Sequence, residues 1–339
     1  SESAASRGSV RHTYSGNWRR ESYVNVKRPT RPFGVAGQVF FVRGNPAWVE
    51  YYASQQAHIS QLYTPTLFYG KSANHDAYIE IRYPGDTTRV VKPLTTDKLL
   101  NTITIAEGNV KGVRINFFKA DSIPIYGVNS ADFSGVHVDN FSSRGNSGLP
   151  LSLFNTALMR DFDTALGTYD LIVLHFGANV LNYGSLDYSW YQKGMAKVVE
   201  QLRTCFPKAS FLIISTADKS SKYGTEMKTD TAVVPLSLAQ QAYAADTQAG
   251  FINLYELMGG EGSMLKWVKA NPPLAGKDYT HFNARGTKKV AQLLYRELMK
   301  RYLGYKNPKA TPEELEQQIE SSKDSLLHRN TIMDFYNND

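Results

Sequence analysis

The chain has 339 residues, of which 42% are hydrophobic, and is therefore long and apolar enough to form two domains with their own cores. Its net charge of +7 would suit an anionic partner, but the lysines and arginines are scattered, so nucleic-acid binding is not predicted. The single cysteine, Cys205, excludes an intrachain disulfide, and no apolar run reaches the roughly 18 residues of a membrane span.

Residues 1–32 are polar and show no regular hydrophobic period beyond one predicted strand at residues 10–15. This segment lacks the hydrophobic face with which a domain normally begins. We therefore expect it to be a partial N-terminal segment of a domain that continues later in the chain. The chain begins with Ser1 instead of methionine and shows no signal peptide, which leads us to expect a processed or truncated product.

Residues 33–131 contain short apolar runs bounded by glycine, proline and asparagine. Apolar and polar side chains alternate from Ala77 to Tyr83, as in a half-buried strand. Further strands are predicted at residues 35–42, 48–52 and 112–119. Several short strands at this spacing predict a β-sandwich of jelly-roll type.

Residues 132–304 alternate between strand and helix patterns. Strands are predicted at 136–140, 169–176, 210–215 and 250–254, and helices at 149–166, 190–205, 236–248 and 287–301. This alternation predicts an α/β domain with a three-layer, doubly wound parallel sheet of flavodoxin-like type. The nearly all-apolar run at 169–176 is typical of a central strand covered on both faces. Residues 305–339 are a polar tail, in which Thr311 and the acids after it predict a helix start.

Three polar turns, at residues 143–148, 177–182 and 277–283, are predicted to lie at the carboxyl edge of this sheet, where open parallel sheets bind ligands. In the third turn, Asp278 precedes His281 by three residues and can orient its imidazole as a general base for a hydroxyl nucleophile. Asn179, in the second turn, can donate to an oxyanion. Simpler roles remain open: a helix cap for Asp278, a cap or core residue for His281, and a turn residue for Asn179.

These turns resemble conserved blocks of the SGNH (GDSL-type) esterases over residues 133–303. Ser147-Gly148 resembles the second block, and Asp278 with His281 resembles the fourth. The sequence from Gly177 to Val180 resembles the third block, with valine in place of the usual aspartate. The resemblance implies that Gly148, with Gly145 as the alternate, and Asn179 bind an oxyanion, and that His281 is a base oriented by Asp278.

The Gly-Asp-Ser block with the serine nucleophile of this family is absent. The nearest sequence, from Gly127 to Ser130, lacks the acid and precedes the second block too closely, so neither Ser130 nor Ser147 is preferred. Some family members carry a β-sandwich inserted between the serine and glycine blocks, and residues 9–18 resemble Bacteroidetes members of this kind. The resemblance therefore implies an inserted sandwich at 33–131 and a nucleophile upstream of Ser1.

The resemblance implies a serine esterase that removes acetyl or other acyl groups from a carbohydrate, in the periplasm or outside the cell. No metal or other cofactor is predicted, because the histidines lack ligand spacing and no phosphate loop or dinucleotide fingerprint is present. Two alternatives remain open. One is a carbohydrate-binding or scaffold protein without activity, and the other is an O-acyltransferase that uses the same residues.

Overall fold

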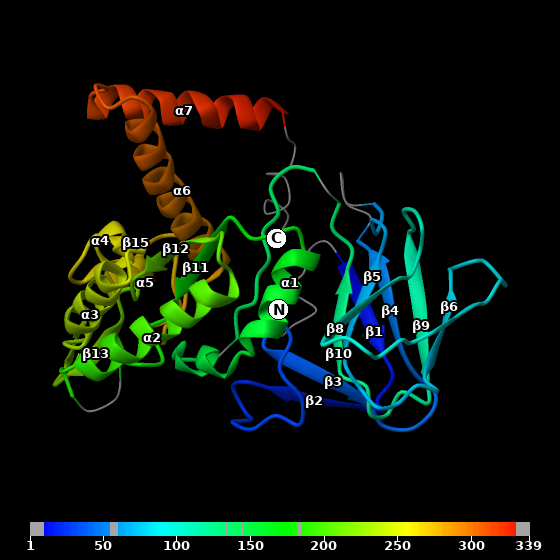
Figure 1. Cartoon of the computed structure of the whole chain (residues 1–339). Coiled ribbons are helices and arrows are strands. Elements are labelled where there is room, and N and C mark those ends of the chain that lie inside the picture. The colour runs from blue at the N-terminus through cyan, green and yellow to red at the C-terminus, as the bar shows by residue number, and fades with distance from the viewer. Residues whose placement is uncertain (1–9, 55–59, 133, 144, 182–184, 330–339) are drawn as a thin grey trace. The chain divides into compact units, whose positions relative to one another are not determined.

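The computed structural model describes residues 10–54, 60–132, 134–143, 145–181 and 185–329 (Figure 1). The chain divides into two compact units, each described here by itself. The first comprises Ser1–Asp170 with Val198–Ala209, and the second comprises Leu171–Lys197 with Ser210–Asp339. Within the described ranges, no helix is both long and apolar enough to cross a membrane.

The first unit is built on two antiparallel sheets of five strands each. One sheet has the order β1 (Val10–Tyr14), β4 (Ala47–Ala53), β9 (Gly112–Phe118), β6 (Tyr78–Arg82), β7 (Val90–Pro93). The other has the order β2 (Trp18–Ser22), β3 (Gln38–Val42), β10 (Ile125–Asn129), β5 (Thr66–Gly70), β8 (Leu100–Thr104). We call these two sheets, residues 10–129, the β-module.

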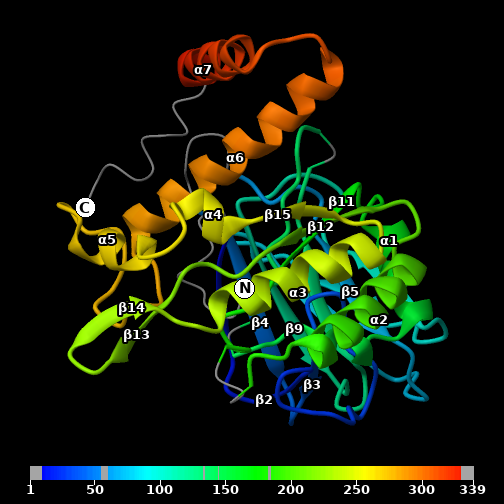
Figure 2. The same ribbon diagram turned by 90° about the vertical axis from the view of Figure 1, so that its left-hand side faces the viewer.

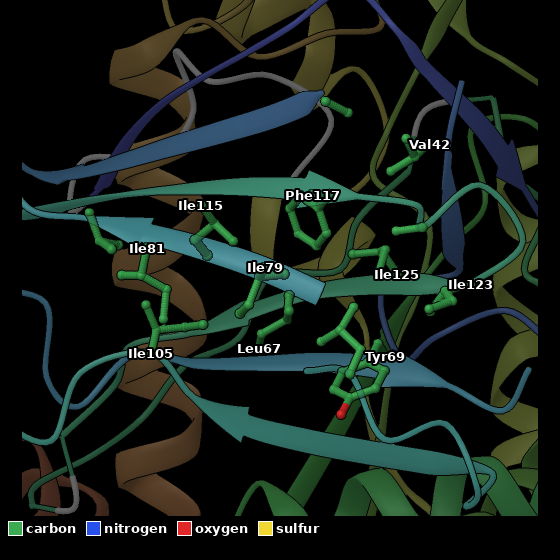
Figure 3. Packing of buried hydrophobic residues seen from close by; sticks show 14 of the residues in the cluster. Val42, Leu67, Tyr69, Ile79, Ile81, Ile105, Ile115, Phe117, Ile123 and Ile125 are labelled. Atoms are coloured by element: carbon green, nitrogen blue, oxygen red, sulfur yellow. The ribbon is translucent and has the colours of Figure 1, made fainter. Parts of the chain in front are cut away.

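Strands of both sheets contribute side chains to one hydrophobic core (Figure 3). Ile79 and Ile81 of β6 are fully buried and Arg82, its last residue, is exposed, as the alternation in this segment predicts. Glu80, between the two isoleucines, is also buried and departs from that alternation. From the opposite sheet, Leu67 and Tyr69 of β5 enter the same core. Each buried side chain of this size contributes about 1.5–3 kcal/mol of hydrophobic free energy.

The β-module begins earlier than the sequence predicts. Strand β1 is confirmed, but it pairs with β4, and β2 pairs with β3, so the described residues 10–22 belong to the antiparallel sheets. The ring of Trp18 packs edge-on against Phe117 at a centroid distance of 5.2 Å. The boundary predicted at residue 33 is therefore wrong for these residues. Strands this short show no period of their own, and only their long-range partners identify them.

Residues 132–170 also differ from the prediction. The segment 136–140 forms no strand, and Val136 and Val138 are 93% and 86% exposed. The helix predicted at 149–166 is broken into a 3-10 helix, η2 (Leu149–Leu153), and α1 (Thr156–Ala165). The break occurs at Asn155, whose side chain accepts a hydrogen bond from Leu158 N and so begins α1 as its N-cap.

The second unit contains a parallel sheet of three strands in the order β11 (Leu171–His175), β12 (Ser210–Ile214), β15 (Gly250–Ile252). The hairpin formed by β13 (Ser220–Tyr223) and β14 (Glu226–Thr229) follows β12 and is not predicted by the sequence. Helix α2 (Ser189–Cys205) begins in this unit, and its residues from Val198 on belong to the first. The other helices of the second unit are α3 (Val233–Asp246), α4 (Leu254–Met258), α5 (Ser263–Lys269), α6 (Ala284–Lys306) and α7 (Pro312–Arg329) (Figure 2). Side chains of α4, α5 and α6 pack on Leu212 and Ile214 of β12.

Strand β11 is at the edge of the described sheet, not at its centre. Leu171 and Val173 are each 46% exposed, whereas Leu174 is buried. Parallel sheets are normally covered on both faces, so two aliphatic side chains exposed on an unpaired edge strand are unusual. The prediction of a central strand is therefore wrong for the sheet as described, and its doubly wound, three-layer arrangement remains a prediction.

The tail does form a helix, α7. Thr311 Oγ1 accepts a hydrogen bond from Glu314 N at 3.2 Å, and Glu314 Oε2 accepts one from Thr311 N at 2.8 Å. This reciprocal pair is a capping box, which satisfies two of the free N–H groups at a helix start. Ile319 of α7 is fully buried, and Arg296 of α6 forms an ion pair with Glu320 at 3.1 Å.

Candidate active site

The Asp278 and His281 side chains form a hydrogen-bonded pair, as the sequence predicts. Asp278 Oδ2 lies 2.8 Å from His281 Nδ1, and Asp278 Oδ1 accepts from the backbone N–H of His281 at 3.0 Å. Both carboxylate oxygens thus bond the same residue, so the ring is held in position. Asp278 is not a helix cap, because Asn283 caps α6 and one oxygen of Asp278 bonds the ring itself.

Hydrogen bonds from the backbone N–H and then the ring of His281 lower the pKa of Asp278 to about 2. The carboxylate is therefore charged at neutral pH and can stabilise an imidazolium. The His281 side chain is 80% exposed, and among the described residues no group is hydrogen-bonded to its Nε2. The nitrogen that a general base would use is available to a reacting group.

The loop that carries this pair is closed across its base. Gly276 N donates to His281 O at 2.8 Å, and Asn283 N donates to Leu274 O at 3.1 Å. Asn283 then caps α6 by accepting from Gly286 N at 3.0 Å. His281 is therefore held two residues before a helix cap, and the predicted placement of the loop at the start of the last long helix is confirmed.

Asn179 lies on an exposed turn directly after β11. The turn is closed by Val180 N, which donates to Gly177 O at 2.7 Å. Gly177 has φ 151°, and a Cβ there would lie 2.5 Å from the Cβ of Thr216, so only glycine fits. Close packing of Gly177 on the segment after β12 therefore determines the position of the turn that carries Asn179.

The segment 215–220, which follows β12, lies beside both loops. Thr216 contacts Gly177 of the Asn179 turn, and Ser220 N donates to the carbonyl of Tyr279, within the Asp278–His281 loop, at 3.0 Å. Both loops therefore meet the chain just beyond the carboxyl end of β12, which is the edge where parallel sheets bind ligands. Whether the Asn179 amide and His281 serve one reaction remains a prediction.

Gly148 belongs to the first unit, where it is the N-cap of η2 with φ 90°. Its backbone N–H donates to the side chain of Asn146 at 2.9 Å, and Asn146 Nδ2 in turn donates to Tyr23 Oη at 2.7 Å. Before this N–H could bind an oxyanion, its hydrogen bond to the Asn146 side chain would have to break. Asn146 is 3% exposed and is not identified by sequence reasoning, since nothing in the motif indicates that its side chain folds back on Gly148.

Solved structures are similar to this chain. A peptidoglycan O-acetylesterase structure is 20% identical over 86% of this chain and 77% of its own, with a TM-score of 0.62. An acetyl xylan esterase is 21% identical over 44% of this chain and 75% of its own, with a TM-score of 0.32. A GDSL-like lipase from Bacteroides thetaiotaomicron is 20% identical over 46% and 73%, also with a TM-score of 0.32. The chain has the fold of the peptidoglycan O-acetylesterase structure. No protein-family model and no curated protein sequence matches it.

One residue that positions the candidate site is not predicted from the sequence. Gln240 of α3 is fully buried, and its Nε2 donates to Phe176 O while its Oε1 accepts from Thr216 N, both at 2.7 Å. A single amide thereby joins the residues that follow β11 and β12. Gln240 lies inside a helix pattern, 64 positions from Phe176 and 24 from Thr216 in sequence, so only the fold reveals its partners.

We expect Gln240→Leu to destabilise the second unit by about 2–4 kcal/mol, because a buried carbonyl and a buried N–H lose their partner. Urea unfolding monitored by circular dichroism measures this change. Gln192→Leu is the matched control: that side chain bonds Asp246 at an exposed position, so its loss should stay within about 0.5 kcal/mol. Equal effects of the two substitutions would contradict a special role for Gln240.

Proposed function

We propose that this chain carries the base and an oxyanion donor of a serine esterase that removes acetyl or other acyl groups from a carbohydrate. The observation that carries the proposal is the Asp278–His281 pair, with Nδ1 bonded at 2.8 Å and Nε2 available. Asp278 holds the ring in the tautomer that leaves Nε2 unprotonated, as a base acting on a hydroxyl requires.

The proposed reaction has two halves. A serine Oγ attacks the acyl carbon while His281 Nε2 takes its proton, and the resulting oxyanion is bound by the Asn179 side chain. Collapse of the intermediate breaks the ester bond, and His281 returns the proton to the departing sugar oxygen. Water then attacks the acyl-serine with His281 again as base, releasing the acid and restoring the serine. One oxyanion donor of this kind typically contributes about 3–4 kcal/mol.

The nucleophile is proposed to come from a further strand beside β11. The open edge of β11 and the exposed Leu171 and Val173 support this, because one more strand would satisfy the edge and cover apolar surface. If that strand ran parallel to β11, its carboxyl end would lie at the same edge as Asn179. A serine at that end would then be near the proposed donor.

The proposed substrate class rests on likeness of fold. The solved structure with the TM-score of 0.62 is a peptidoglycan O-acetylesterase, so an acetylated glycan is the substrate class that we propose here. Such glycans are found in cell walls, and the proposed compartment is accordingly the periplasm or the cell exterior. Acyl transfer to a sugar would use the same residues, and the products distinguish it: free acetate from hydrolysis, an acetylated acceptor from transfer.

The test compares two forms of the protein on p-nitrophenyl acetate. The 339-residue chain should show no serine-dependent turnover, because loss of the nucleophile removes nearly all triad chemistry. A longer form that adds a strand with Gly-Asp-Ser should show turnover and react with a fluorophosphonate at that serine. Labelling of Ser130 or Ser147 in the 339-residue chain, with turnover, would show that the nucleophile lies within it and would overturn the proposal for a further strand.

A further inference from the structure

The β-module contains an open pocket of about 600 Å³ that is separate in sequence from every residue of the candidate active site. Four segments line it: the end of the loop between β2 and β3, the loop after β5, the loop between β7 and β8, and the start of β10. The residues that matter for its chemistry are Arg31, Lys71, His75, Asp97 and Tyr126. All of them belong to the first unit.

Tyr126, which lines the pocket, has a buried hydroxyl with no hydrogen-bond partner among the described residues. The residue as a whole is 8% exposed. A buried hydroxyl in this state costs about 1–3 kcal/mol, so proteins normally satisfy such groups. Burial raises the pKa of Tyr126 well above its ordinary value, and the hydroxyl is therefore protonated and able to donate.

The backbone around Tyr126 accommodates its ring. The pairing of β10 with β5 shifts between Ile125 and Gly127, so Tyr126 is the extra residue of a bulge, a feature that redirects a side chain. A Cβ on Gly70 would lie 2.7 Å from Tyr126 Oη, and a Cβ on Gly34 would lie 2.8 Å from its Cδ1. Both glycines therefore leave room for this ring in its present orientation.

The wall beside Tyr126 is formed before any ligand binds. Thr96 Oγ1 donates to the carbonyls of Ser72 and Asn74 at 3.0 and 2.9 Å, and Ser72 N donates to Thr96 O at 3.1 Å. Gly70 N donates to Pro124 O at 2.7 Å. These bonds tie three of the lining segments together, so little conformational entropy is lost when a ligand enters.

The charges at the rim favour an anion that also carries hydroxyl groups. Arg31, Lys71 and His75 are exposed, and no ion pair is found for them within the described ranges. Asp97 is the acidic residue of the lining; it would repel a bare phosphate but can accept from a sugar hydroxyl. Apolar contacts for the C–H face of a ring are available from Pro32, Leu99 and Pro124.

We propose that this pocket binds the carboxylate of an acidic sugar, with Tyr126 Oη donating to the carboxylate and Arg31 and Lys71 supplying positive charge. The proposal goes beyond the esterase activity, because it uses only residues of the β-module and needs no ester to be cleaved. It gives the β-module a ligand class: a glycan with carboxylated units, bound at a point distinct in sequence from Asp278 and His281.

Isothermal titration of the 339-residue chain with glucuronic acid tests the proposal, and glucuronamide is the control ligand of the same shape without the charge. The acid should bind at least tenfold more tightly than the amide. Tyr126→Phe should weaken binding of the acid about tenfold, since it removes one hydrogen bond to a charged group. It should leave the melting temperature unchanged or higher, because the hydroxyl has no partner to lose.

Lys71→Gln should also weaken binding, whereas Lys111→Gln, which changes an exposed lysine outside the lining, should not. If Tyr126→Phe proves unstable, the comparison of these two exposed positions decides the question. Equal affinity for the acid and the amide would overturn the proposal. Unchanged affinity for the acid in both Tyr126→Phe and Lys71→Gln would also overturn it. Inorganic phosphate binding as tightly as glucuronic acid would also overturn it, since the pocket would then bind charge alone.

Discussion

Replacing His281 by alanine should lower kcat for p-nitrophenyl acetate by about 10⁴-fold or more in the form of the protein that carries the Gly-Asp-Ser strand. The imidazole is the only base in the proposed reaction, and nucleophile and base act as a unit. The melting temperature should not change, because the side chain is 80% exposed and, among the described residues, its ring bonds only to Asp278. Stopped assays with enzyme in excess would measure the residual rate.

The chain offers a matched control for this substitution. His137 is also an exposed histidine beside an acid, with Nε2 3.5 Å from Asp132 Oδ1. His137→Ala removes the same kind of exposed pair without touching the Asp278 loop, so turnover should remain within about twofold of the parent, as for an ordinary surface change. A His281→Ala variant that keeps a tenth or more of the parent rate would rule out His281 as the base.

Replacing Gly286 by alanine should destabilise the second unit by about 3 kcal/mol or more, at the upper end for overpacking. A Cβ at this position would lie 1.8 Å from the carbonyl oxygen of Leu274 and 2.9 Å from its carbonyl carbon. These are backbone atoms, and the same carbonyl already accepts from Asn283 N, so the strain cannot be relieved by turning a side chain. The start of α6 must therefore move, and His281 with it.

Gly304, in the same helix, is the control. A Cβ there would lie 3.8 Å from Leu315 Cδ1, which is ordinary contact. Gly304→Ala should therefore stabilise α6 slightly, by about 0.5–1 kcal/mol, because alanine has the higher helix propensity. Urea unfolding read from tryptophan fluorescence is suitable, since Trp267 packs against Phe282 at a centroid distance of 5.5 Å. The same stability for both variants would contradict the close contact at Leu274.

The Asp278–His281 pair was predictable because its chemistry is local. Two residues three positions apart on a loop that enters a helix can meet without any help from the rest of the fold, and the 2.8 Å contact follows. Asn179 was placed on its turn by the apolar strand before it, although its role as an oxyanion donor remains a prediction. Gln240 was not predictable, because only tertiary packing brings it near the backbone atoms of Phe176 and Thr216. Asn146 was missed although its bond to the Gly148 N–H, two residues on, is local.

The sequence by itself determined the features that depend on short-range order. Alternation from Ala77 to Tyr83 predicted β6, and the Thr311 cap predicted the start of α7. Tertiary structure alone decided features that depend on partners far along the chain. Strand β1 exists because it pairs with β4 about 40 residues later, and residues 136–140 form no strand because no described strand forms a β-ladder with them. Tyr126 likewise becomes a binding candidate only where Gly34 and Gly70 meet its ring. A hydrophobic period records which face of a segment is buried, but it carries no record of which distant segment buries it.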